Sequence, residues 1–147
     1  MGELDEKVIS PVEVAAWPRP KGYVNGMLTA GRGERVLFVA GQVGWRPEAE
    51  RVETADFALQ FGIALDNVLA VVRAAGGGPE SIARMTVYVT DVAEYRASTR
   101  AVGKEWKARM GACFPAMALV GVAALVEEGA KLEIEATAVL RAEGARP

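Results

Sequence analysis

Two carboxylates, Glu133 and Glu135, have the spacing that most directly suggests chemistry in this chain. They stand two positions apart within residues 131–140, where apolar and polar residues alternate as in a β-strand. Residues two apart on a strand point to the same face, and the strand rise places them roughly 6.5–7 Å apart. Paired carboxylates can perform acid–base catalysis. The same spacing also fits carboxylates at a sheet edge or paired with Lys131, and the residues alone favour that structural interpretation.

The rest of the composition narrows the available chemistry. The chain has no histidine and a single cysteine, Cys113, which excludes zinc sites, His-based triads and an internal disulfide. Acid–base work must therefore fall to carboxylates, tyrosine, lysine or backbone groups. Cys113 stands beside Phe114, and we interpret it as a small, partly buried hydrophobe rather than a nucleophile. We expect no metal and no other cofactor.

Length and charge define the class of protein. The 147 residues suit a single domain, 1–147, and 51% hydrophobic with 24% charged residues is a globular composition. A formal net charge of −2 argues against nucleic acid or an anionic membrane as a partner. No apolar run reaches the roughly 20 residues of a membrane helix, and the N-terminus lacks a signal-peptide pattern. We expect a cytoplasmic protein.

The elements that must position the two carboxylates follow from periodicity and turn residues. Residues 1–22 contain three prolines and little periodicity, which predicts an irregular N-terminal arm. The order β-β-α-β-α-β-β follows, which gives an α+β fold with one sheet and two helices on one face. The predicted strands are residues 23–29, 36–43, 83–90, 117–125 and 131–140, and the predicted helices are residues 54–75 and 91–110.

Local signals set the ends of the helices. Thr54 is the predicted cap of the first helix, and Gly76 follows its end. Asp91 and Glu94 resemble a capping box at the start of the second helix.

Gly41, inside a nearly continuous apolar strand, predicts a bulge or a close approach of another group. The sheet face without helices needs cover, which a homo-oligomer would supply.

Six short motifs occur in the order of a known family. They are GYVNG at 22–26, VAGQ at 39–42, LDNV at 65–68 with AAG at 74–76, TVYVTD at 86–91, FPA at 114–116 and EIEA at 133–136. Together they cover residues 23–140, and the chain resembles the Rid family (reactive intermediate deaminases, also called YjgF or L-PSP endoribonuclease-like proteins). The resemblance implies a chorismate-mutase-like fold that assembles as a homotrimer around a central barrel. It also implies small-molecule clefts at the subunit interfaces.

The family's chemistry is the hydrolysis of enamines and imines to 2-oxo acids and ammonia. In its archetypal members an arginine directly after Phe-Pro-Ala binds the substrate carboxylate, a glutamate in the last strand positions water, and a tyrosine lines the cleft. The tyrosine corresponds to Tyr23 and the glutamate to Glu133, whereas the arginine position holds Met117. Methionine cannot bind a carboxylate bidentately as a guanidinium does.

Other expected cleft positions are more apolar than in the family. Ala40 replaces a serine beside Gly41, Leu119 replaces a polar residue, and Thr99 replaces an asparagine. The residues expected to line the cleft are Tyr23, Ala40, Gly41, Thr99, Phe114, Met117 and Leu119, with Glu133 as the catalytic group.

Three functions remain open at this point. The first is a deaminase-like hydrolase that acts on a larger or uncharged substrate, with no activity on 2-iminopropionate or 2-iminobutyrate. The second is a trimer that binds a small molecule without catalysis. The third, a ribonuclease, is disfavoured because the chain lacks histidine and a basic patch.

Overall fold

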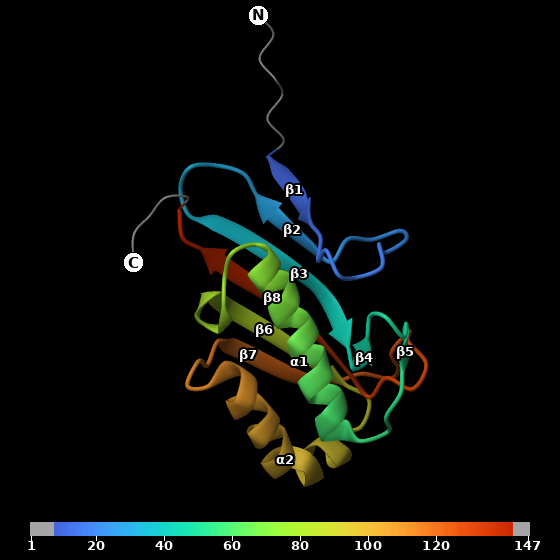
Figure 1. The fold of residues 1–147 in the computed structure, drawn as a ribbon. Coiled ribbons are helices and arrows are strands. Elements are labelled where there is room, and N and C mark those ends of the chain that lie inside the picture. Colours follow the sequence, from blue (N-terminus) through green and yellow to red (C-terminus); the bar gives the residue numbers. More distant parts are fainter. Residues whose placement is uncertain (1–7, 143–147) are drawn as a thin grey trace, which may run out of the picture.

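The computed structural model describes residues 8–142, which form one mixed six-stranded sheet with both helices on one side (Figure 1). The strand order is β1-β2-β3-β8-β6-β7, and β6 and β7 alone run parallel within this described sheet. The elements are β1 Ile9–Val12, β2 Gly26–Thr29, β3 Arg35–Val43, β4 Trp45–Arg46, β5 Arg51–Val52, α1 Phe57–Ala74, the 3₁₀ turn η1 Pro79–Ser81, β6 Ile82–Val89, α2 Val92–Met110, β7 Ala116–Gly121 and β8 Leu132–Leu140. The predicted α+β fold, with one sheet and two helices on one face, is confirmed.

The N-terminal arm is more regular than the sequence predicts. Part of the predicted irregular arm, residues 1–22, forms β1, and β1 pairs with β2 in the register Ile9↔Thr29. Pro11 suggested irregular structure, but an edge strand tolerates a proline because one side of the strand makes no ladder hydrogen bonds. Residues 1–7 of that arm lie outside the described residues. A short β4–β5 hairpin also replaces the loop expected at 44–51.

Two predicted strands are shorter in the structure. The strand expected at 23–29 begins only at Gly26, and the strand expected at 117–125 ends at Gly121. Beyond Gly121 the apolar run continues outside the sheet, and Val126 is fully exposed. Hydrophobicity alone cannot mark where an edge strand stops, because apolar residues also occur in exposed turns.

The helix caps confirm one prediction and correct another. Asp91 caps α2 by accepting a hydrogen bond from the backbone N of Glu94 at 3.1 Å, as predicted. The cap of α1 is Asp56 and not Thr54, because the Asp56 carboxylate accepts from the backbone N of Leu59 at 2.9 Å. Thr54 instead supports Asp56, whose backbone N donates to the Thr54 hydroxyl at 3.1 Å.

The core lies between the helices and the sheet. Its largest fully buried side chains include Leu37 of β3, Leu65 of α1 and Ile134 of β8. In β8 the predicted alternation is confirmed: Leu132, Ile134, Ala136 and Ala138 are buried. By length and composition α1 could cross a membrane, but 67% of it is buried inside the protein, as in the core helix of a globular domain.

The other face of the sheet has no cover within the chain. Phe38, Val120 and Val139 are exposed there, and Phe38 is 52% accessible. Glu133 and Glu135 lie on this same open face, since they alternate with the buried residues of β8. The sheet therefore carries its acidic pair on the side away from both helices.

Candidate functional site

Glu133 lies against the backbone of Gly41 on the neighbouring strand. A Cβ atom at position 41 would lie only 2.0 Å from Glu133 Oε1. The β3–β8 register shifts between Val39 and Gln42, which is the bulge or close approach predicted at Gly41. The absence of a side chain at position 41 thus allows the carboxylate to fold over β3.

Burial and a neighbouring charge set the protonation of Glu133. Partial burial raises the pKa of Glu133 above 4.5, and the negative charge of Glu135 raises it further. Glu135 accepts a hydrogen bond from the Tyr88 hydroxyl at 2.6 Å, and this bond raises the pKa of Tyr88. A carboxyl group with a raised pKa can exchange protons nearer neutral pH.

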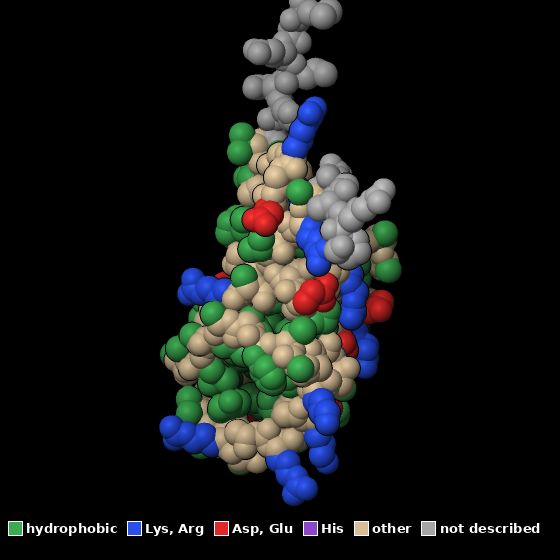
Figure 2. Space-filling view, turned by 90° about the vertical axis from the view of Figure 1, so that its left-hand side faces the viewer, with side chains coloured by type: hydrophobic (Ala, Val, Ile, Leu, Met, Phe, Trp, Pro, Cys, Tyr) green, Lys and Arg blue, Asp and Glu red, His purple; other side chains and the backbone are tan. Residues whose placement is uncertain are grey.

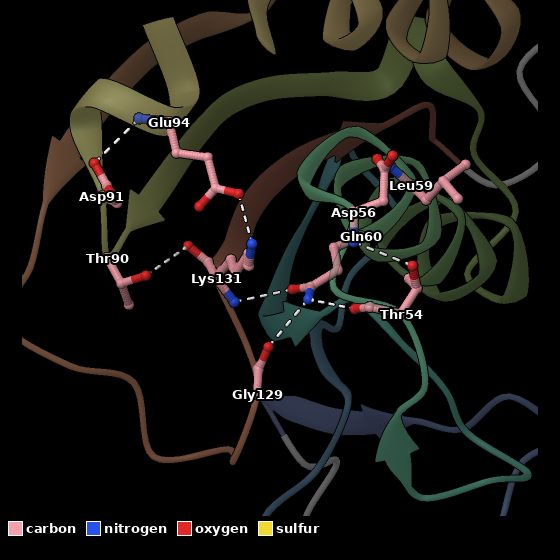
Figure 3. Close-up of polar contacts among 9 residues, drawn as sticks. All are labelled: Thr54, Asp56, Leu59, Gln60, Thr90, Asp91, Glu94, Gly129 and Lys131. Carbon is pink, nitrogen blue, oxygen red and sulfur yellow. Dashed lines mark hydrogen bonds and ion pairs between the residues drawn. The ribbon is translucent and has the colours of Figure 1, made fainter. Parts of the chain in front are cut away.

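The suggested pairing of these carboxylates with Lys131 is wrong. The Lys131 ammonium points to the helix side and binds Glu94 of α2 (Figure 3). Among residues 8–142 the Glu94 carboxylate accepts no hydrogen bond from the backbone N of Asp91, so the predicted capping box is only half formed. No ion pair of Glu133 or Glu135 occurs among residues 8–142. Glu133 is therefore a partly desolvated carboxylate without a compensating cation inside the described chain.

A buried glutamine fixes the start of β8, two residues before Glu133. Gln60 of α1 donates from Nε2 to the carbonyls of Thr54 and Gly129, at 2.7 and 3.0 Å (Figure 3). Its Oε1 accepts from the backbone N of Lys131 at 2.9 Å. All these bonds join α1 to backbone groups, so they hold the turn before β8 in one position.

A second buried amide fixes the end of β3. Asn67 Nδ2 donates to the carbonyls of Val43 and Trp45, at 3.2 and 2.7 Å. Val43 is the register partner of Glu133. Hydrogen bonds from α1 thus hold the end of β3 and the residues directly before β8.

Beside Gly41 there is a cavity of about 360 Å³ at the end of β3. Its lining includes Tyr23, Asn25 and Gly41, together with the loop before β2 and the β4–β5 hairpin. Ala40 lies next to it, and its backbone N donates to the carbonyl of Asn25 at 2.9 Å. Of the expected site residues, Tyr23 and Gly41 line this cavity, Ala40 precedes Gly41 on β3, and Gly41 alone is shown in contact range of Glu133.

The other expected residues line a second, larger groove between α2 and β7. It encloses about 730 Å³, and Thr99, Phe114, Met117 and Leu119 all line it. Figure 2 views the side of the molecule where β7 and α2 lie in Figure 1, and hydrophobic side chains there surround a hollow. The rings of Trp106 and Phe114 stack at 6.1 Å with an interplanar angle of 11°. We call this hollow the α2–β7 groove.

The two groups lie on opposite faces of the sheet. Met117 pairs in register with Met85, whose side chain is buried under the helices. Glu133 pairs with Tyr88, which lies on the open face. Residues an odd number apart on β6 point to opposite faces, so Met117 and Glu133 do not face each other within one chain.

Sequence reasoning missed several residues around these sites. Trp106 and Lys107 line the α2–β7 groove, and Gln60 and Asn67 hold the strands. The positions of Thr99, Gly103 and Lys107, four apart, were the available signal for one helix stripe. Within residues 8–142, no cluster of three or more Cys, Asp or Glu side chains is placed to hold a metal ion.

Comparison with known proteins adds an independent line of evidence. The family model described as Endoribonuclease L-PSP matches residues 18–140. An Escherichia coli protein named 2-iminobutanoate/2-iminopropanoate deaminase is 38% identical over 106 residues, which cover 72% of this chain and 80% of that protein. A Bos taurus protein of the same name is 31% identical over 139 residues, which cover 95% and 93% of the two chains.

Solved structures agree with the fold. The YjgF gene product of E. coli matches with a TM-score of 0.74 and 33% identity, covering 90% of this chain and 99% of that one. E. coli TdcF, solved with bound serine, matches with a TM-score of 0.73 and 30% identity, covering 88% and 98%.

Proposed function

Because the chain belongs to the Endoribonuclease L-PSP family, which includes the Rid and YjgF deaminases, we propose that it hydrolyses a reactive imine or enamine. The observation that carries this proposal is the position of Glu133 against Gly41. Glu133 is a partly desolvated carboxylate with a raised pKa, and Gly41, against which it lies, lines a cavity together with Tyr23. No side-chain cation of the described residues pairs with Glu133, so its carboxylate is free to interact with a neutral or protonated C=N group and with the attacking water.

The proposed reaction uses Glu133 as the proton carrier. As the oxygen of a water molecule bonds to the imine carbon, the carboxylate takes a proton from that water and the C=N π electrons move to nitrogen. Nitrogen then takes up the proton to give a carbinolamine. The hydroxyl proton next passes through Glu133 to nitrogen, the C–N bond breaks, and a carbonyl and ammonia form. An enamine enters the same sequence after protonation at carbon.

We propose that the complete site forms between subunits. Glu133, Gly41 and Tyr23 lie apart from the α2–β7 groove with Met117, so each chain would contribute one half to a shared cleft. The uncovered apolar side chains of the sheet support an assembly, and by analogy with the family we propose a homotrimer of single-domain chains in the cytoplasm. The absence of His and the charge of −2 do not support RNA as a substrate, in spite of the family's description.

The proposed substrate differs from those named for the relatives. Met117 has no donor for a carboxylate, and it lies 45% exposed in an apolar groove. Small imino acids such as 2-iminopropanoate gain little from an apolar surface and would lose the bidentate ion pair that arginine makes. We therefore propose a larger imine, or one without a carboxylate near the C=N bond.

A second candidate, ligand binding without catalysis, is favoured by one observation. In the α2–β7 groove the residues that could transfer protons are Tyr95 and Lys107, and most of the lining is apolar. Such a groove could bind a small molecule even if Glu133 takes no part in chemistry.

The test is a turnover assay on imines generated in place by an amino-acid oxidase with catalase, across amino acids of increasing side-chain size. The 2-oxo acid released by hydrolysis is measured in competition with semicarbazide, which traps the free imine. We expect acceleration with at least one larger imine, and a loss of about a hundredfold in Glu133→Gln. Glu128→Gln, at an exposed glutamate before β8, is the matched control and should keep the rate. No acceleration with any imine would overturn the catalytic proposal and leave the binding function.

A further inference from the structure

The α2–β7 groove contains one charged side chain, Lys107, among its lining residues. Lys107 is exposed in the last turn of α2, and its ammonium makes no hydrogen bond or ion pair within residues 8–142. The next basic residue of that turn behaves differently. Arg109 binds both Asp66 and Glu105, and the bond to Asp66 chiefly raises its pKa. A free ammonium at an apolar hollow is available to a ligand in a way that Arg109 is not.

The walls of the groove are aromatic and aliphatic. Trp106 and Phe114 stack in parallel, and Phe114 remains 76% exposed, which leaves one ring face open to solvent. Met117 and Leu119 continue the apolar surface along β7. Flat rings and flexible thioethers are the side chains that bind planar or branched apolar groups.

We infer that the α2–β7 groove binds an organic anion with an aromatic or branched apolar body, whose carboxylate pairs with Lys107. The inference rests on the proposed function and deepens it, because it names the substrate class of that same cleft: imines in which an apolar body separates the carboxylate from the C=N group. The groove combines apolar walls with a cation on one side, and this charge pattern matches a carboxylate attached to a hydrophobic body.

The position of the cation explains why size matters. Arginine at position 117 would bind a carboxylate on β7 itself, whereas Lys107 lies across the groove on α2. A ligand must extend over the apolar surface to reach Lys107 while its C=N group remains free for the other half of the site. A lysine is a point charge on a flexible stem, so it accepts several carboxylate positions and selects less by geometry than arginine does.

Unreactive probes can test the inference separately from catalysis. Isothermal titration calorimetry would compare three probes. 3-Phenylpropanoate carries both the ring and the charge, propanoate carries the charge alone, and 3-phenylpropanamide carries the ring alone. We expect 3-phenylpropanoate to bind about tenfold to a hundredfold more tightly than propanoate, because the ring is buried. Lys107→Met should weaken 3-phenylpropanoate about threefold to tenfold and leave the amide unchanged.

The matched control is Lys104→Met. Lys104 is an exposed lysine on the same helix that does not line the groove, so its loss changes net charge without changing the site. Equal effects of the two substitutions, or unchanged binding in Lys107→Met, would overturn the inference. Absence of binding by every probe would also overturn it.

These outcomes remain distinct from failure of the proposed reaction. Lys107-dependent binding without turnover of any imine would support the groove's ligand class and reject catalysis. Turnover that is insensitive to Lys107→Met would support catalysis and reject this ligand class.

Discussion

The carboxylate of Glu133 occupies the space that a side chain at position 41 would need. A Cβ atom there would lie 2.0 Å from Oε1 and 2.8 Å from Cδ of Glu133. The backbone at Gly41 does not have a positive φ, so an alanine is allowed at this position by its own conformation. Glycine is thus required at position 41 by the volume of the Glu133 carboxylate and not by backbone strain.

Gly41→Ala should therefore remove activity without unfolding the protein. The new methyl group must displace the Glu133 carboxylate, and we expect turnover of the best imine substrate to fall at least about tenfold. Thermal denaturation should change little, because a flexible side chain can move aside. Gly33→Ala is the control, since no atom lies within 4 Å of a Cβ there. Full activity in Gly41→Ala would show that the position of Glu133 is unimportant.

Glu133→Gln should change how stability depends on pH. The folded pKa of Glu133 is raised above 4.5, chiefly by burial and then by Glu135, so folding favours the protonated form. Below pH 4.5 both states hold the proton and the carboxylate costs nothing extra. As the pH rises from there through the folded pKa, the wild-type protein loses stability relative to Glu133→Gln, and the difference then levels off.

Urea denaturation at a series of pH values measures this difference. Glu135→Gln is the comparison, because it removes the neighbouring charge and should lower the folded pKa of Glu133. A constant difference between wild type and Glu133→Gln across the series would contradict the raised pKa.

Met117→Arg should create activity on small imino acids. A guanidinium at the exposed position 117 can bind a carboxylate with two parallel hydrogen bonds, which methionine cannot do. We expect hydrolysis of 2-iminopropanoate to rise at least about tenfold above wild type, measured as pyruvate release. Met117→Lys, which adds charge without the planar fork, should gain less. Efficient hydrolysis by the wild-type protein would show that Met117 does not limit the substrate.

Gln60→Leu should destabilise the whole domain. The substitution removes a fully buried amide and leaves the carbonyls of Thr54 and Gly129 and the backbone N of Lys131 without their partner in a partly buried place. We expect a loss of about 2–4 kcal/mol in the free energy of unfolding. Leu59→Ala, at the exposed neighbouring position, should cost much less. A loss below about 1 kcal/mol would mean that water replaces the amide.

Much of the fold follows from periodicity in the sequence. The alternation in β8 predicts which residues are buried, because a strand with one covered face needs a repeat of two. The edge strand β1 was missed because it has little periodicity and contains Pro11. The choice of Asp56 over Thr54 as a cap depends on where the first turn closes, and both residues are acceptable caps.

The site could be predicted only in part. The family motifs indicate Tyr23, Gly41 and Glu133, and the structure places Gly41 against Glu133 and beside the cavity that Tyr23 lines. The separation of Met117 from Glu133 follows from the parallel register of β6 and β7, which joins Met85 to Met117. Such a register depends on contacts between distant segments, and no local pattern encodes it.

If the proposed reaction needs both Glu133 and the α2–β7 groove, which lie on opposite faces of one sheet, a single chain cannot complete it. If neighbouring chains supply the missing halves, specific activity must fall on dilution below the concentration at which the subunits separate. Two inactive proteins should also rescue each other when they are mixed and reassembled. A chain damaged only at Gly41 still offers an intact α2–β7 groove, and a chain damaged only in that groove still offers an intact Glu133. The catalytic unit would then be the interface between two chains. In a mixture of two variants, activity would depend on which variants share an interface.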